Sequence, residues 1–223
     1  MRWGYRRLHL LLEREGTKAN PKRIYRLYRD EGLAVRRRKR KRVAVARRPM
    51  PAPARLNDCW AMDFVSDTLA SGRKYRVLNV IDTLSREGLV SEVDTSLPGA
   101  RVVRALETAA MWRGYPARIT CDNGPEFRSR ALDAWAYEHR VTLDFIDPGK
   151  PIQNSLCESF NGRMRDECLN VHWWRTVEEA RRGIEAYRRD YNQVRPHSAL
   201  DGRTPAAYAA ERGTQLNLQG LLT

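Results

Sequence analysis

The sequence predicts an α/β protein in which a mixed five-stranded sheet is covered by helices. Three strand-like segments follow one another at residues 59–67, 74–82 and 88–93, and short turns connect them. After them, helical and strand-like periodicities alternate to about residue 169. Three successive strands with tight connections favour an antiparallel meander, and the alternation that follows favours a sheet with helices on its faces.

The N-terminal segment, residues 1–35, shows the pattern of two short basic helices joined by a turn. The first covers residues 2–15, and the second begins where Asn20 is a good N-cap and Pro21 suits the first helical position. This arrangement predicts a helix-turn-helix segment. Two helices alone bury too little surface to be stable. We therefore expect them to dock on the body, or the chain to be a truncated or partial reading frame.

Residues 36–56 read as a linker, basic at first and then rich in proline. Residues 1–48 contain 18 Lys and Arg against 4 Asp and Glu, whereas the rest of the chain is balanced. Because the surplus of basic residues is confined to this segment, it predicts an arm that binds a polyanion. A basic face that serves only solubility is the alternative. The arm consists of Arg36, Arg37, Arg38, Lys39, Arg40, Lys41 and Arg42.

The body is predicted to cover residues 57–210, with a tail at 211–223. In the first strand, Trp60, Met62 and Phe64 fall on one face, and the residues between them, including Asp63, fall on the other. Thr176 and Glu179 have the spacing of a capping box at the start of the last predicted helix. The other elements expected are helix 98–113, strand 117–121, helix 129–140, strand 141–146 and helix 154–169.

Three acidic residues carry the candidate chemistry: Asp63, Asp122 and Glu158. Asp63 interrupts an apolar strand, where a carboxylate needs a cation or hydrogen-bond donors. Asp122 ends a strand before Asn-Gly, so a turn-forming role is the simple alternative. Glu158 follows after 35 intervening residues and falls in a helical pattern, where most glutamates are merely solvated. Carboxylates from a strand interior, a strand end and a helix together suggest a divalent-metal site.

Projecting the helix around Glu158 at about 100° per residue separates two stripes. Leu156, Phe160, Met164 and Cys168 form an apolar flank that should face the core. Asn154, Glu158, Asn161 and Arg165 form a separate polar stripe. An acid beside two amides and an arginine is typical of a surface that binds phosphate and metal together.

Hard oxygen ligands without a neighbouring His or Cys favour Mg²⁺ over zinc, with Mn²⁺ as the alternative ion. Two such ions, about 3.5–4 Å apart, suit in-line displacement at a phosphodiester. The four histidines are scattered and there is no GxSxG elbow, so no rival triad is indicated. The four cysteines show no CxxC spacing, which argues against a zinc ribbon or a disulfide framework.

No apolar run is long enough to span a membrane, and no signal-peptide core follows Met1. We therefore expect a cytoplasmic protein without a membrane partner.

Four segments, in this order and spacing, resemble one known family: WAMDF, CDNGPEF, PGKPIQNSLCESFNGRMRDECLN and YNQVRPHSALDGRTP. They are similar to the second-frame (OrfB) transposase of the insertion sequence three family, a group of the DDE transposases that is itself similar to retroviral integrases. The resemblance covers nearly the whole chain, because the N-terminal segment also resembles the family's helix-turn-helix.

The resemblance implies an RNase H-like integrase core with Asp63, Asp122 and Glu158 as catalytic metal ligands. It implies cutting at transposon ends and strand transfer by the exposed 3′-hydroxyl. Its expected partners are transposon-end DNA, target DNA, further copies of the chain and a first-frame (OrfA) product, all at the bacterial nucleoid. The residues that would face DNA are Asn123, Lys150, Asn154 and Arg165. A non-transposing DNA-binding remnant and a nuclease of the same fold are the alternatives.

Overall fold

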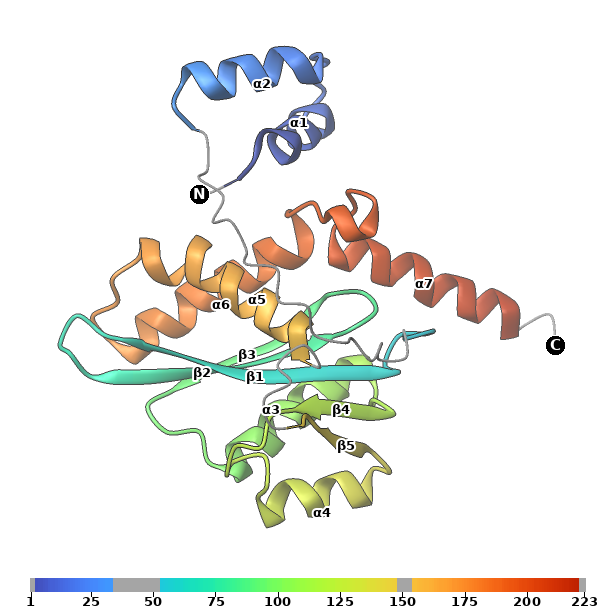
Figure 1. Ribbon diagram of the computed structural model, residues 1–223. Helices are drawn as coiled ribbons and strands as arrows, with labels where there is room; N and C mark the ends of the chain where they lie inside the picture. Colours follow the sequence, from blue (N-terminus) through green and yellow to red (C-terminus); the bar gives the residue numbers. More distant parts are fainter. Residues whose placement is uncertain (1–2, 34–52, 148–153, 221–223) are drawn as a thin grey trace.

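The computed structural model describes residues 3–33, 53–147 and 154–220. Its centre is a five-stranded mixed sheet in the order β3-β2-β1-β4-β5, with helices on both faces (Figure 1). The strands are β1 (Cys59–Thr68), β2 (Lys74–Asp82), β3 (Gly88–Asp94), β4 (Arg118–Cys121) and β5 (Thr142–Phe145). The predicted α/β class and five-stranded sheet are confirmed.

Strand pairing places β1 in the middle of the sheet. β1, β2 and β3 pair in antiparallel fashion, which confirms the meander. β1 runs parallel to β4, and β4 runs parallel to β5. The carboxyl ends of β1 and β4 therefore point to the same edge of the sheet.

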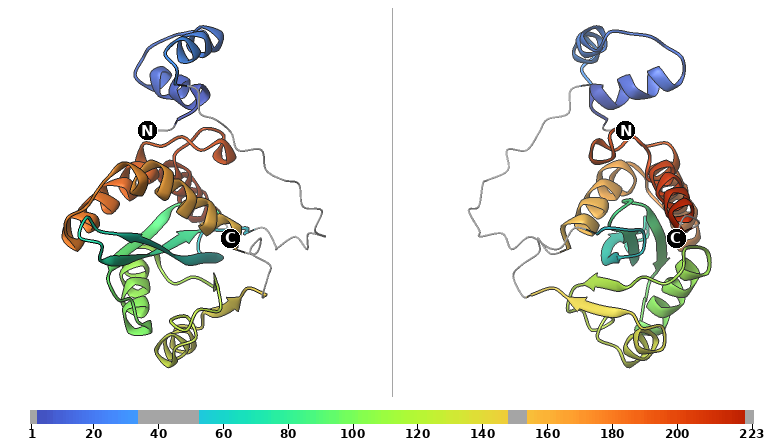
Figure 2. Two further views of the ribbon diagram at one scale, coloured as in Figure 1. Left: turned by 60° about the vertical axis from the view of Figure 1, so that its left-hand side comes forward. Right: turned by 90° about the vertical axis from the view of Figure 1, so that its right-hand side faces the viewer.

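The two faces of the sheet have separate hydrophobic cores. α3 and α4 cover one face, while α5, α6 and α7 lie on the other side (Figures 1 and 2). Trp60, Met62 and Phe64 of β1 pack toward α3 and α4, whereas Ala61 and Val65 join the core under α5 and α6. This confirms the predicted alternation along β1. The helices are α3 (Gly99–Arg113), α4 (Arg130–Glu138), α5 (Ser155–Glu167), α6 (Val177–Gln193) and α7 (Pro205–Gly220).

Local capping explains where several helices begin. The Asn20 side chain accepts a hydrogen bond from Lys22 N at 2.8 Å, directly before Pro21. Thr176 Oγ1 accepts from Glu179 N at 3.1 Å. Glu179 bonds back to the amide of Arg175 at 2.8 Å, one residue earlier than a standard capping box would place it.

The N-terminal hairpin consists of α1 (Tyr5–Arg14) and α2 (Pro21–Asp30) and docks on the body. Arg14 donates to the carbonyls of Val194, at 3.1 Å, and Gly202, at 2.8 Å. Arg7 lies 3.8 Å from a carboxylate oxygen of Glu167, at the end of α5. These polar contacts link the hairpin to the side of the body that carries α5, α6 and α7.

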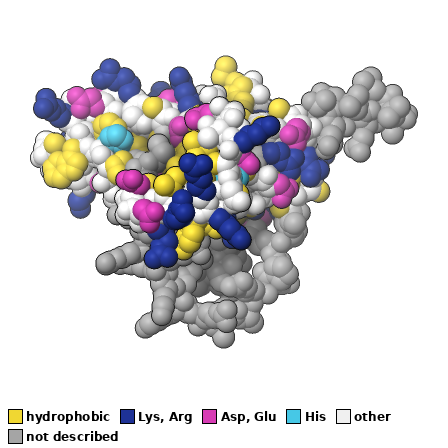
Figure 3. Space-filling view, turned by 90° about the horizontal axis from the view of Figure 1, so that it is seen from above, with side chains coloured by type: hydrophobic (Ala, Val, Ile, Leu, Met, Phe, Trp, Pro, Cys, Tyr) yellow, Lys and Arg dark blue, Asp and Glu magenta, His cyan; other side chains and the backbone are white. Residues whose placement is uncertain are grey.

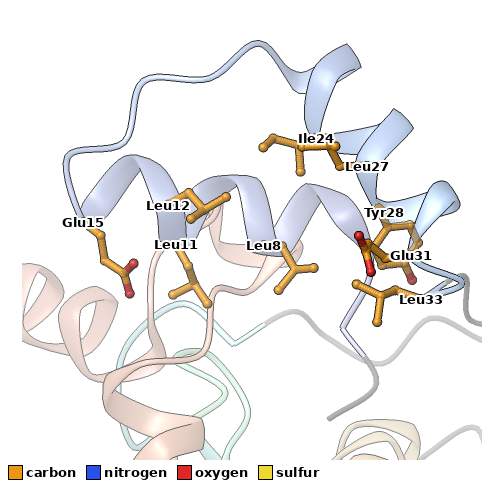
Figure 4. Close-up of a pocket in the computed structure, with 9 residues that line it drawn as sticks. All are labelled: Leu8, Leu11, Leu12, Glu15, Ile24, Leu27, Tyr28, Glu31 and Leu33. Atoms are coloured by element: carbon orange, nitrogen blue, oxygen red, sulfur yellow. The ribbon is translucent and has the colours of Figure 1, made fainter.

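An apolar groove of about 350 Å³ runs between α1 and α2 (Figure 4). Apolar side chains of α1 and α2 line it together, with two acidic residues among them. It is lined by Leu8, Leu11, Leu12, Glu15, Ile24, Leu27, Tyr28, Glu31 and Leu33. It belongs wholly to the hairpin, so it is separate from the predicted carboxylate site.

Helix α7 crosses the expected end of the body at residue 210 and continues to Gly220, while the domain boundary itself stays a prediction. Pro205 occupies the first helical position, and Thr204 Oγ1 accepts a hydrogen bond from Ala207 N at 3.2 Å. The alanines, glutamines and leucines that follow are good helix formers, and no proline interrupts them, so the helix continues past Gly213. Among the helices that the structure describes, none has the length and apolarity needed to cross a membrane.

Candidate active site

The parallel pairing of β1 and β4 brings Asp63 and Asp122 side by side. Ala61 of β1 is paired with Thr120 of β4, so a continuation of the same register by two residues aligns Asp63 with Asp122. Neighbouring strands lie about 4.8 Å apart. The two aspartates therefore meet at the edge where β4 ends.

Helix α5 crosses β1 and brings Glu158 to the same region. Asn161 Nδ2 donates to Asp63 Oδ2 at 2.9 Å, and Asn154 Nδ2 donates to the carbonyl of Met62 at 2.9 Å. Glu158 lies between these two asparagines on the polar stripe of the helix. Both contacts hold this stripe over β1, so the exposed Glu158 carboxylate lies near Asp63.

The charges of Asp122 and Glu158 both act on Asp63. The pKa of Asp63 is raised from 3.8 to about 6, first because burial penalises the charged form. The negative charges of Asp122 and Glu158 raise it further, while hydrogen bonds from Phe64 N and Asn161 oppose the rise. Burial also raises the pKa of Glu158. The structure therefore places Asp122 and Glu158 close enough for their charges to act on Asp63, and the role of the three acids as a catalytic triad stays a prediction.

The donor set suits a hard divalent cation, because its ligands are carboxylate oxygens whose repulsion a cation would relieve. Within the described ranges 3–33, 53–147 and 154–220, however, no three acidic, His or Cys side chains form a ready-made metal cluster. The carboxylates are thus within electrostatic reach of one another and would need to draw closer around an ion.

A chain of hydrogen-bonded polar side chains inside the protein supports Asp63. Ser91 Oγ donates to Asn79 Oδ1 at 2.7 Å, and Asn79 Nδ2 donates to Asn161 Oδ1 at 2.7 Å. Asn161 then donates to Asp63. Sequence reasoning placed Asn161 on the right stripe but missed Asn79 and Ser91. The available signal was Asn79 itself, a polar residue in the apolar strand KYRVLNVID.

The predicted DNA-facing neighbours have different environments. Asn154 is only 3% exposed, and its Nδ2 donates to a carbonyl inside the protein where α5 packs against β1, so its contact with DNA stays a prediction. Asn123 is exposed and donates to the carbonyl of Ile146 at 2.7 Å. Arg165 is exposed and donates to the carbonyl of Ser66 at 3.0 Å. Lys150 and the arm from Arg36 to Arg42 lie outside the described residues.

The raised pKa of Asp63 predicts a pH-dependent stability difference between the metal-free wild type and Asp63→Asn. The fold favours protonated Asp63, so its stabilising contribution is complete below about pH 4 and is lost as the pH rises to about 6. The substituted side chain does not titrate. Its free energy of unfolding, relative to wild type, should therefore increase over that interval and then level off.

Urea unfolding in the presence of a chelator, repeated across this pH range, measures the difference. Any hydrogen bond that the amide cannot replace shifts the whole curve equally, so the slope is the diagnostic quantity. A difference that is independent of pH would contradict the assigned environment of Asp63.

The strand order, the aligned aspartates and a third carboxylate on a covering helix define an integrase-type catalytic core with an RNase H-like fold. Comparison of the sequence with protein families agrees. Residues 53–151 and 139–205 match models of the integrase core domain, and residues 1–41 match a model of an HTH-like domain.

Among known proteins, the chain is 54% identical over 211 residues to an uncharacterized 31.7 kDa protein of insertion element IS407 from Burkholderia multivorans, covering 94% of this chain and 76% of that protein. It is 49% identical to an uncharacterized 39.2 kDa protein of IS476 from Xanthomonas euvesicatoria, covering 96% and 62%. It is 28% identical to the putative transposase InsK of IS150 from Escherichia coli, covering 93% and 77%. The chain belongs to the insertion-sequence transposases of the DDE transposase and integrase superfamily, which are polynucleotidyl transferases.

Solved structures support the fold. An intasome of simian T-cell lymphotropic virus gives a TM-score of 0.64 at 15% identity, over 86% of this chain and 67% of that one. The catalytic core of HTLV-2 integrase in complex with magnesium gives 0.56 at 18% identity, over 70% and 98%. At these identities the likeness concerns the fold alone.

Proposed function

We propose that this chain catalyses divalent-metal-dependent cleavage at transposon ends and joins the exposed 3′-hydroxyl to another DNA strand. The observation that carries the proposal is the register of β1 and β4, in which Ala61 pairs with Thr120, two residues before Asp63 and Asp122, together with the hydrogen bond that α5 makes to Asp63 through Asn161. Membership of the transposase family supports the reaction class, and the basic N-terminal segment supports a DNA substrate.

Asp63, Asp122 and Glu158 would hold the metal, with Mg²⁺ as the expected ion, Mn²⁺ as the alternative and two ions as the expected number. The magnesium-bound HTLV-2 integrase core supports this choice for a protein of the same fold. When bound, such ions lower the pKa of an attacking water or hydroxyl and stabilise charge on the leaving oxygen.

The chain's own residues orient the acids. Asn161 holds one oxygen of Asp63, and the amide of Phe64 holds the other at 2.8 Å. The amide of Gly124 donates to Asp122 Oδ1 at 2.9 Å. Each aspartate therefore keeps a fixed direction, and its remaining lone pairs are available to a cation.

DNA contacts are proposed on the basic surface. Seen from above, Lys and Arg side chains spread over this side of the molecule among single acidic residues (Figure 3). Four basic residues of α2 are exposed: Lys22, Arg23, Arg26 and Arg29. With the arm at residues 36–42, Lys150, Asn123 and Arg165, they would contact phosphates, because such contacts dominate affinity for DNA. Binding to transposon-end and target DNA at the nucleoid would involve several copies of the chain, with a first-frame product as a further partner.

An assay that detects joined DNA separates the proposal from its rivals. With labelled transposon-end DNA and Mg²⁺, we expect both cleaved ends and products in which the 3′-end is joined to a second strand. A nuclease of the same fold would give cleavage without joining. A DNA-binding remnant would shift the DNA in a gel and give neither product.

Gly162 offers a test of how closely DNA approaches α5. A Cβ at this exposed helical position would meet nothing within 4 Å, so the protein itself does not require glycine there. Gly162→Ala should stabilise the fold by up to about 1 kcal/mol in urea unfolding. If the DNA backbone packs against this position, the same variant should join DNA more slowly. Faster or unchanged joining by the stabilised variant would rule out such an approach.

A further inference from the structure

A cluster of aromatic and charged side chains lies behind Asp63, on the opposite face of the sheet. Phe64 follows Asp63 on β1 and therefore points toward α3 and α4. Its ring stacks on Phe127, with centroids 4.9 Å apart and planes inclined by 12°. The guanidinium of Arg76 lies 3.9 Å from the centroid of the same Phe64 ring. Arg76 also forms an ion pair with Glu126.

This cluster holds the loop that carries Asp122. Glu126 and Phe127 follow Asp122 by four and five residues, so the ion pair and the ring stack both fasten the loop to β1 and β2. Within the loop, Phe127 N donates to the carbonyl of Gly124 at 3.0 Å, and Gly124 N donates to Asp122 Oδ1 at 2.9 Å. One compact turn thus connects Asp122 to Glu126 and Phe127, the residues through which the loop contacts the sheet.

Gly124 shows how tight the turn is. A Cβ at this position would lie 3.0 Å from Asp122 Oδ1 and 3.3 Å from Glu126 Oε2. Both carboxylates therefore border the space where a side chain of residue 124 would begin, and movement of Glu126 would change the space available to Asp122. Arg76 also lowers the pKa of Glu126, so the pair is charged at neutral pH.

We propose that Glu126 and Arg76 are positioning residues that keep Asp122 beside Asp63, so that the two carboxylates can close on a metal ion. The inference rests on the proposed function, because it assigns a role in that metal site. Neither residue needs to touch the ion. Arg76 and Phe64 hold the loop that carries Asp122 against the sheet beside the strand that carries Asp63. Loss of the ion pair therefore allows Asp122 to move away from Asp63 while the sheet remains intact.

The experiment compares Glu126→Gln with Glu92→Gln as a matched control. Glu92 forms an ion pair with Arg101 at 2.7 Å on the same sheet, and the side chains of the two pairs have similar exposure. Calorimetric titration of the DNA-free protein with Mn²⁺ gives the metal affinity directly. The Mg²⁺ concentration that gives half-maximal joining, the Tm and the DNA affinity are measured in parallel.

Glu126→Gln should weaken Mn²⁺ binding and raise the Mg²⁺ requirement about tenfold or more, as expected for a group that supports metal ligands. Its Tm and DNA affinity should match those of Glu92→Gln. Arg76→Gln should have the same effect, and the double variant should be no worse than either single one, because both act through one ion pair.

Unchanged metal titrations for Glu126→Gln would overturn the proposal, as would a loss confined to Tm. Failure of the wild type to join DNA under any condition would instead overturn the proposed function. The calorimetric comparison would still report on the positioning role, so the two failures are distinguishable.

Discussion

Asp63→Asn is expected to reduce metal-dependent DNA joining by more than about a hundredfold, because even groups that only support metal ligands cost 10- to 100-fold. The amide retains nearly the size of the carboxylate but removes the negative charge that a cation needs. Joining of labelled transposon-end DNA at saturating Mg²⁺ measures the loss.

Asp67→Asn is the matched control for this variant. Asp67 lies on the same strand and face, and its Oδ1 accepts from Thr68 N at 2.8 Å, as Asp63 Oδ1 does from Phe64 N. It lies four residues farther along β1 and is not among the charges that raise the pKa of Asp63. Asp67→Asn should therefore keep its activity. Equal losses in both variants would show that the strand, and not the carboxylate, had been disturbed.

Glu167→Gln is expected to destabilise the protein by about 3–5 kcal/mol, because it leaves a buried guanidinium without its counter-charge. Arg195 is 1% exposed and binds Glu167 through two hydrogen bonds, of 2.9 and 2.5 Å. The neighbouring His197 is also buried, and its pKa is lowered to about 3 by burial and by nearby arginines, so it is neutral at neutral pH and adds no further positive charge beside Arg195. Urea unfolding at neutral pH measures the effect.

Two comparisons make this prediction specific. Glu178→Gln removes an exposed ion pair with Arg181, and its effect should stay below about 1 kcal/mol. Replacing Arg195 by Met together with Glu167 by Leu should recover much of the lost stability, since no unpaired charge remains. A loss from Glu167→Gln no larger than that from Glu178→Gln would show that Arg195 finds other partners.

Much of the fold is predictable because its signals are local. Alternating residues in β1, the Asn20 cap before Pro21 and the Thr176 cap each depend on a few neighbouring positions. The three acids of the site could also be predicted from the sequence, since Asp63 interrupts an apolar strand and Glu158 lies in a polar stripe of its helix. Their proximity in the folded protein depends on strand register, which cannot be predicted from the sequence pattern.

What escaped prediction depends on packing between distant segments. Asn154 has the same polar character as its stripe neighbours, yet β1 covers it. The ion pair of Arg76 with Glu126 joins residues 50 positions apart, and nothing in the spacing of either motif indicates it. The extension of α7 beyond residue 210 follows from ordinary helix propensity, which the weak apolar pattern there concealed.

Three carboxylates, from β1, the end of β4 and α5, are proposed to close around one metal centre. Crystals of the protein soaked in Mn²⁺ test this arrangement through the anomalous signal of the ion. We expect a peak about 2.1 Å from oxygens of Asp63 and Asp122, with Glu158 turned toward it. The peak should be absent from crystals of Asp63→Asn. An ion bound elsewhere, or one that persists in that variant, would contradict a shared metal site of the three acids.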